Sequence, residues 1–429
     1  MELAADPADL FALTCYKGDI LHDLGAVREA RPVYEAALAA APDDAGRCRA
    51  WLGLAAAKRI TDDLDGALAD LDRAGAVAAR LGLTAEAAQV HFLRGNLLFP
   101  RGDIEGCLQE HRRSLDLARR AGSAELEAAA LGGLGDAEYI RGRMISAHER
   151  FRACAALAHR HGFGRIEVAN LPMAAITRFY TNDLADTLDD ALAAVAAAAR
   201  VGHQRAEIIA HHAAYLCLYA MADCAAAAAH VDASLDLSRR LGAKRFESET
   251  LALRAELRRT AGRREEAVAD LEEALAISRA TGMSYIGPWI LAILAISTDD
   301  PGTRASALAE AETLLTAGCA SHNYFWFYRD AIEICLEIGD WGSAERYAAA
   351  LEDYTRPEPL PWSDLIIARA RALAAFGRGR RDAALIDQLG RLRAEAGRIG
   401  LAIALPALDD ALRGAGPRPS GGRLWSRVR

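Results

Sequence analysis

Glycine recurs six times at intervals of 40 residues, and each time it closes a run of apolar periodicity. The six positions are Gly82, Gly122, Gly162, Gly202, Gly242 and Gly282. A helix-turn-helix unit cannot bury its apolar face alone, so units with a fixed length of about 20 to 50 residues stack on their neighbours. This spacing therefore predicts an all-α array of helical repeats.

Pairs of small residues, 12 positions apart, set the register inside the repeats. In the first unit, Gly18 and Ala30 form such a pair, and Tyr34, Ala37 and Pro42 follow. The pair lies where the two helices of a unit cross, because only small residues let the backbones approach closely, and the ring fills the gap against the next unit. These positions match the tetratricopeptide (TPR) pattern. We therefore expect a TPR-like right-handed superhelix, an α-solenoid of about ten units, whose helices have about 16 to 18 residues.

The phase of the repeat slips after Gly282. The turn sequence over residues 299–302 interrupts the pattern, and the next closing glycine, Gly318, comes early. The expected organisation is a regular TPR-like array over residues 1–282, a second TPR-like lobe with irregular phase and a C-terminal capping helix over 283–412, and a disordered basic tail over 413–429.

Composition argues against several classes of function. The formal net charge of −8 and the pI near 5.8 do not fit a basic stripe that follows a nucleic-acid backbone. No apolar run approaches the roughly 18 residues of a membrane span, and the first residues lack the pattern of a secretory signal. The eight cysteines are scattered, without a Cys-x-x-Cys pair, which fits a reducing compartment. We expect a cytoplasmic protein whose partner is neither nucleic acid nor a membrane.

No motif for catalysis or cofactor binding stands out. The P-loop sequence G-x-x-x-x-G-K-[ST] does not occur. His159 and His161, and likewise His211 and His212, are only one or two positions apart, so their side chains point in different directions on a helix. The pattern favours ordinary packing or exposure of these rings over a metal site. We expect no metal, no cofactor and no enzymatic activity.

The strongest functional signal is a ladder of aromatic residues at position 12 of successive first helices. The ladder residues are Phe99, Tyr139, Phe179 and Tyr219, at intervals of 40. In TPR units this position faces the concave groove, as do positions 5 and 9. Those positions hold Phe92, Asn96, Asp136 and His212. We expect these eight residues to form a trough that grips an extended peptide or an amphipathic helix. The alternative is that the rings pack against one another as core.

A second aromatic group comprises the five consecutive residues 324–328, which precede Trp341, Tyr354 and Trp362. Five consecutive rings cannot all lie on one side of a helix. The group therefore indicates either an exposed interface or internal packing between two lobes.

Several strings resemble the C-terminal TPR region of bacterial multidomain adenylate/guanylate cyclases that also carry an AAA-type ATPase module. The strings are RGRMISAHERFR (141–152), HGFGRIEVANLPM (161–173), GHQRAE (202–207), SHNYFWFYRDAIE (321–333) and RYAAALEDYTRPEPLPWSD (346–364). The resemblance covers most of residues 85–412. It implies a regulatory arm that receives a partner or ligand and passes its binding state to cyclase or ATPase modules. Cyclase activity is not carried over, because this chain has neither a P-loop nor a counterpart of the metal-binding aspartates.

Two functional hypotheses follow from the sequence. The first is a non-catalytic TPR scaffold or sensor arm that mediates protein–protein interaction in signal transduction. The second is a small-molecule sensor, with a metabolite held where the trough narrows around Phe179, His212 and Tyr219. A pocket closed on several sides there would favour the second. The sequence leaves open whether the chain is part of a longer cyclase–ATPase protein.

Overall fold

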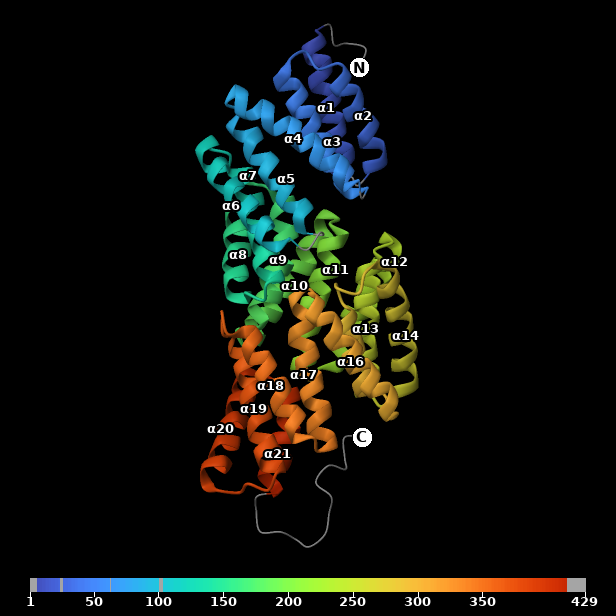
Figure 1. The fold of residues 1–429 in the computed structure, drawn as a ribbon, viewed down its shortest axis with the longest axis vertical. Helices are drawn as coiled ribbons and strands as arrows, with labels where there is room; N and C mark the ends of the chain where they lie inside the picture. The colour runs from blue at the N-terminus through green and yellow to red at the C-terminus, as the bar shows by residue number, and fades with distance from the viewer. Residues whose placement is uncertain (1–5, 24–25, 62, 100–102, 415–429) are drawn as a thin grey trace. The chain divides into compact units, whose positions relative to one another are not determined.

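The chain is all-α in the computed structural model, which describes residues 6–23, 26–61, 63–99 and 103–414. Within these ranges it forms 21 α-helices and the short 3-10 helix η2, and no strand (Figure 1). None of the described helices has the length and apolar character needed to cross a membrane. Most of the expected basic tail over 413–429 lies outside the described residues.

Successive helices pair into hairpins of the expected TPR-like kind. The helices are α1 (Pro7–Asp23), α2 (Val27–Ala39), α3 (Asp44–Ile60), α4 (Leu64–Leu81), α5 (Thr84–Leu98), α6 (Ile104–Ala121), α7 (Ala124–Ile140), α8 (Met144–His161), α9 (Gly164–Phe179), α10 (Leu184–Val201), α11 (Gln204–Ala220), α12 (Cys224–Leu241), α13 (Lys244–Thr260), α14 (Arg264–Thr281), α15 (Gly287–Ser297), α16 (Pro301–Ala317), α17 (Ser321–Ile338), α18 (Trp341–Thr355), α19 (Pro361–Gly377), α20 (Ala383–Ile399), η2 (Ala402–Ala404) and α21 (Leu405–Gly414). Helices α3 to α14 have 15 to 18 residues each, close to the expected length.

The helices form two compact units. Unit 1 comprises the described residues of 1–137 and 153–166, and unit 2 those of 138–152 and 167–429. Helices α7, α8 and α9 contain residues of both units. The boundary expected after residue 282 lies within unit 2, and a division into lobes at that point stays a prediction.

The periodic glycines end the second helix of each hairpin. The five from Gly82 to Gly242 have φ between 66° and 75°, the left-handed conformation that lets a helix stop and the chain turn. At Gly282, φ is 112° and ψ is 117°, so α14 ends differently. The short and apolar helix α15 follows, at the place where the repeat slips in the sequence.

In unit 1, a ring from the second helix of a hairpin packs against two glycines. One glycine is in the first helix of the same hairpin, and the other is in the first helix of the next hairpin. The ring of Tyr34 packs against Gly18 and Gly53, as its repeat position predicts. His111 takes the corresponding place between Gly95 and Gly133, and burial lowers the pKa of its imidazole to about 4. A Cβ atom at any of these four glycines would clash with the tyrosine or histidine ring, so each position needs a residue without a side chain.

We expect Gly133→Ala to destabilise unit 1 by about 1–3 kcal/mol, because the added Cβ would lie 2.3 Å from the His111 ring. The matched control is Gly75→Ala in α4, where the Cβ would meet only ordinary contacts, the nearest at 3.5 Å. That change should stabilise the helix by about 0.5–1 kcal/mol, since alanine is the better helix former. Thermal unfolding of both variants checks this, and a shift of the same sign in both would contradict the packing argument.

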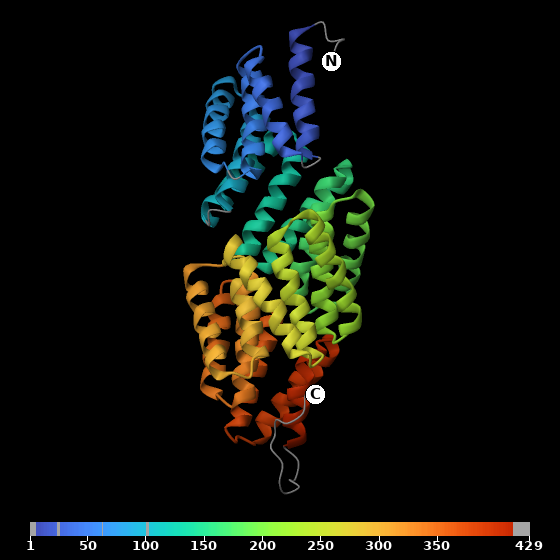
Figure 2. The same ribbon diagram turned by 90° about the vertical axis from the view of Figure 1, so that its right-hand side faces the viewer.

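Unit 2 contains one continuous core that runs from α8 to α21. Helices α9 to α14 are drawn green to yellow in Figures 1 and 2, and α15 to α21 yellow-orange to red. Side chains from both sets of helices meet in this core, including Phe179, Tyr219, Trp326 and Trp362. The core therefore joins parts of the chain far apart in sequence.

Candidate functional site

Three of the ladder residues belong to unit 2. Tyr139 lies at the end of α7, Phe179 is the last residue of α9, and Tyr219 is in the last turn of α11. The 40-residue period places them at the same position of successive hairpins. Phe179 and Tyr219 are only 1% and 3% exposed, and Tyr139 is partly buried.

Each of these three rings is contacted by one residue of α17. The pairs are Tyr139 Oη and His322 Nδ1, 2.9 Å apart; the ring centroids of Phe179 and Trp326, 6.0 Å apart; and the Tyr219 ring centroid and Arg329 Cζ, 5.7 Å apart. His322, Trp326 and Arg329 follow at intervals of four and three residues, which places them on one face of α17. The ladder of unit 2 thus holds a helix of the same chain.

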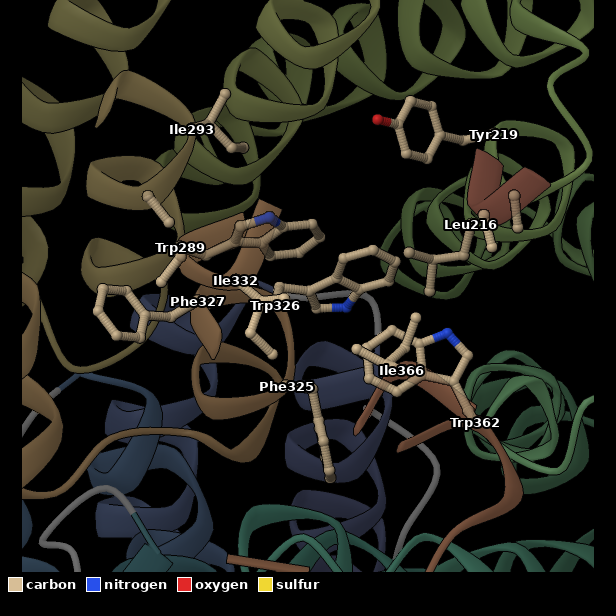
Figure 3. Close-up of a cluster of buried hydrophobic side chains, with 14 of the residues drawn as sticks. Leu216, Tyr219, Trp289, Ile293, Phe325, Trp326, Phe327, Ile332, Trp362 and Ile366 are labelled. Atoms are coloured by element: carbon tan, nitrogen blue, oxygen red, sulfur yellow. The ribbon is translucent and has the colours of Figure 1, made fainter. Parts of the chain in front are cut away.

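Tryptophan rings fill the space around this contact (Figure 3). Trp326 stacks on Trp289, with ring centroids 5.1 Å apart and planes inclined by 13°, and its centroid is 5.5 Å from that of Trp362. Phe325 and Phe327 on either side of Trp326 are fully buried. The central rings of the second aromatic group therefore pack internally and do not form an exposed interface, whereas packing between two separate lobes stays a prediction.

The sequence leaves an open trough and a packed core as alternatives for the ladder. In unit 2, the burial of Phe179, Tyr219 and also His212 matches the packed core, because a partner does not reach rings that are less than 5% exposed. A role for these residues in binding a partner stays a prediction.

A buried charge cluster lies beside Tyr219. Arg329 Nη2 donates to Glu256 Oε1 at 2.8 Å, and the hydroxyl of Tyr215 donates to the other carboxylate oxygen at 2.8 Å. Arg329 Nη1 lies 3.1 Å from the carboxylate of Asp330. The side chains of Arg329, Glu256 and Asp330 are 7%, 2% and 1% exposed. Two carboxylates thus face the Arg329 guanidinium away from water, and the charge of Arg259 acts on both as well.

Stability should depend on pH through Asp330. Burial raises the pKa of its carboxyl to about 7 against the opposing charge of Arg329, with Glu256 adding to the rise. An unfolded aspartate has a pKa of about 4. Between about pH 4 and 7 the folded chain therefore binds the proton more tightly than the unfolded chain, and this contribution to stability is lost as the pH rises.

We expect Asp330→Asn to remove this dependence. The free energy of unfolding of the variant, minus that of the wild type, should increase from about pH 4 to 7 and level off above, because asparagine stays neutral. Urea unfolding at several pH values measures the difference. Parallel curves for the two proteins would contradict the assignment to Asp330.

His212, at position 5 of its hairpin, is held by three neighbours. Its Nε2 atom lies 2.8 Å from the hydroxyl oxygens of both Thr250 and Ser234, and its Nδ1 atom lies 3.3 Å from Glu249. Burial opposes ionisation of Glu249, but His212, His322 and the hydroxyl of Tyr285 outweigh burial and lower the pKa of this carboxyl to about 2. The arrangement fixes the imidazole in the interior.

A small cavity lies beside His212, lined also by Tyr139, Trp289 and His322. Its volume is about 20 Å³. That is room for about one water molecule. Ligand pockets usually measure about 300–1,000 Å³, so a metabolite does not fit here without rearrangement of the surrounding rings.

The other four expected site residues belong to unit 1. Phe92, Asn96 and Phe99 follow at intervals of four and three residues and share one face of α5, with Phe99 just beyond its last turn. All three are partly exposed, and Asp136 on α7 is exposed. Phe92 contacts the ring of His111, with centroids 5.6 Å apart. This face is the accessible part of the expected site.

The histidines show ordinary packing. His161 stacks on Phe163, with centroids 5.7 Å apart, and His211 Nδ1 lies 2.8 Å from Nδ1 of His230. Burial lowers the pKa of both rings of the second pair, that of His211 to about 4. Over the described ranges, no group of three or more His, Cys, Asp or Glu side chains lies close enough together to hold a metal ion.

The sequence did not reveal α17 as the occupant of the ladder. The string SHNYFWFYRD does place His322, Trp326 and Arg329 at the spacing of one helix face, so a helical reading of it could have isolated them. Nothing in the string indicates which surface they meet, because the Tyr139–His322 contact spans 183 residues.

No protein-family model matches the sequence, and comparison with the curated proteins finds no match. Among solved structures, the chain is similar to a Rap protein in complex with Competence and Sporulation Factor. The TM-score is 0.62 at 12% identity, over 81% of this chain and 98% of that chain. It is also similar to aspartyl phosphate phosphatase F from Bacillus subtilis, with a TM-score of 0.53 at 9% identity, over 84% of this chain and 96% of that chain. At such low identity these likenesses show the fold alone, an all-α solenoid of TPR-like hairpins.

Proposed function

We propose that this chain is a non-catalytic TPR scaffold or sensor arm that binds a protein or peptide partner. The observation that carries the proposal is the contact between the ladder of unit 2 and α17, in which three rings at one repeat position each meet one residue of a single helix face. Phe92, Asn96 and Phe99 take the groove-facing positions of an earlier hairpin in unit 1 and are partly exposed. A partner helix with side chains three and four positions apart fits this face.

A role in signal transduction is supported by the resemblance to the regulatory region of cyclase–ATPase proteins. Two of the strings that carry the resemblance, over 141–152 and 346–364, meet in unit 2. Glu358 accepts hydrogen bonds there from the backbone N–H groups of Ile145 and Ser146, at 2.8 and 3.4 Å, and so caps the start of α8. We propose that the arm passes its binding state to cyclase or ATPase signalling modules in the cytoplasm.

The test is affinity capture of the tagged chain from lysate of its source, with the double variant Phe92→Ala/Phe99→Ala beside it. We expect a cyclase, an ATPase or another signalling protein to be enriched by the wild type and lost in the double variant. The matched control is Phe163→Ala, which removes a partly exposed phenyl ring elsewhere in unit 1 and should keep the partner. Circular dichroism of each variant checks that it is folded.

Two results would count against this function. Capture of the same proteins by the wild type and the double variant would show that the binding site does not lie on α5. A small molecule that co-purifies with the wild type, in the absence of any specific protein, would favour the metabolite sensor. That alternative requires the cavity beside His212 to enlarge well beyond its present volume of about 20 Å³.

A further inference from the structure

A larger cavity lies on α12, α13 and the start of α14. Its volume is about 220 Å³, more than ten times that of the cavity beside His212. Its lining consists of three apolar residues, Ala228, Val231 and Leu257, and of the charged residues Arg254, Arg258, Arg263 and Asp232. None of these residues takes part in the site described above.

Two of the arginines are fixed in place by one buried carboxylate. Arg254 and Arg258 are one turn apart on α13, and Asp270 of α14, whose side chain is 5% exposed, accepts hydrogen bonds from both. The bonds from Arg254 Nε and Nη2 measure 3.0 and 2.6 Å. A guanidinium has five N–H donors, so donors remain on both groups after Asp270 is satisfied. Their side chains are 23% and 22% exposed, which leaves them accessible to a ligand.

Two further acids compete for these guanidinium groups: Asp232, which lines the cavity and acts on Arg254 by its charge, and Glu266, which is held weakly. Glu266 lies 3.6 Å from Arg258 Nε and 3.5 Å from Arg263 Nη1, and its side chain is 49% exposed. Exposed ion pairs with such long distances contribute little to stability. A ligand can therefore displace the Glu266 carboxylate at small cost, whereas the buried Asp270 stays in place and keeps Arg254 and Arg258 oriented.

We propose that this cavity binds an oxyanion group, a phosphate or a carboxylate, between Arg254, Arg258 and Arg263. Planar guanidinium groups bind both oxyanions through paired N–H donors, and the fixed position of two of them reduces the entropic cost of binding. The apolar side of the cavity accommodates the carbon skeleton to which the oxyanion is attached. The site is independent of the partner-binding face on α5.

Calorimetric titration of the full chain with inorganic phosphate and, separately, with succinate tests the proposal. Arg263→Ala should weaken binding about 5- to 10-fold, as the loss of one charge-assisted contact predicts. Glu266→Gln should strengthen binding several-fold, because the competing carboxylate is removed. Both residues are about half exposed, so neither change should affect folding. The control Arg378→Ala removes an exposed arginine that is paired with Glu345 and should bind like the wild type.

The two probes separate the sources of the oxyanion. Binding of phosphate alone assigns a phosphate group, binding of succinate alone assigns a carboxylate, and binding of both supports the shared chemistry. Failure of both probes to bind at millimolar concentration would overturn the proposal. Equal weakening by Arg263→Ala and Arg378→Ala would overturn it too, since that indicates nonspecific charge. Neither result affects the capture experiment, which tests unit 1.

Discussion

Arg329→Met should lower the free energy of unfolding of unit 2 by about 3–5 kcal/mol, the range for removing one partner of a buried ion pair. The change leaves Glu256 and Asp330 buried without their shared cation. Methionine keeps most of the side-chain volume, so the loss reports the charge rather than a cavity. Denaturant unfolding followed by tryptophan fluorescence measures the change, because Trp289, Trp326, Trp341 and Trp362 lie in unit 2.

Two controls separate this effect from a general loss of charge. Arg378→Met removes an exposed arginine from the pair with Glu345 and should cost far less. The triple variant Arg329→Met/Glu256→Gln/Asp330→Asn removes the charge on these three groups and should recover part of the stability, since neutral groups need no counterion. The recovery is incomplete because Arg259 loses the opposing charges of Glu256 and Asp330. If Arg329→Met lost as little stability as Arg378→Met, the buried charge cluster around Arg329 would not hold α17 in place.

Phe179→Ala should destabilise unit 2 by about 3–5 kcal/mol, the cost of removing a buried phenyl ring. The ring is 1% exposed, and its centroid lies 6.0 Å from that of Trp326 and 6.3 Å from that of Trp362. Its removal leaves a cavity among large and rigid side chains that cannot close over it. Thermal and denaturant unfolding, again by tryptophan fluorescence, measure the loss.

Phe92→Ala is the matched control for Phe179→Ala. It removes the same side chain from a groove-facing position, but this ring is partly exposed and belongs to unit 1. Because less apolar surface is buried there, the loss of stability should be markedly smaller. Equal losses would mean that Phe92 is also part of a core, and a negligible loss in Phe179→Ala would mean that its ring is not.

Some features of packing followed from the sequence, and others did not. The position of Tyr34 in the repeat predicted that its ring fills the gap between hairpins, and it packs against Gly18 and Gly53. The same place in a later hairpin holds His111, which a search for aromatic residues overlooks. The cap that Glu358 supplies to α8 was also not predictable, because its partners are more than 200 residues away in the sequence.

The 40-residue period by itself determined the all-α class, the hairpin register, the helix lengths and the glycines at which helices end. These features are local, since each hairpin of a repeat array contacts mainly its neighbours. The exposure of the ladder was decided by tertiary structure alone. Whether Phe179 and Tyr219 face solvent or α17 depends on the rotation between successive hairpins, added up over many hairpins of unit 2. The sequence of a single repeat does not specify this total rotation.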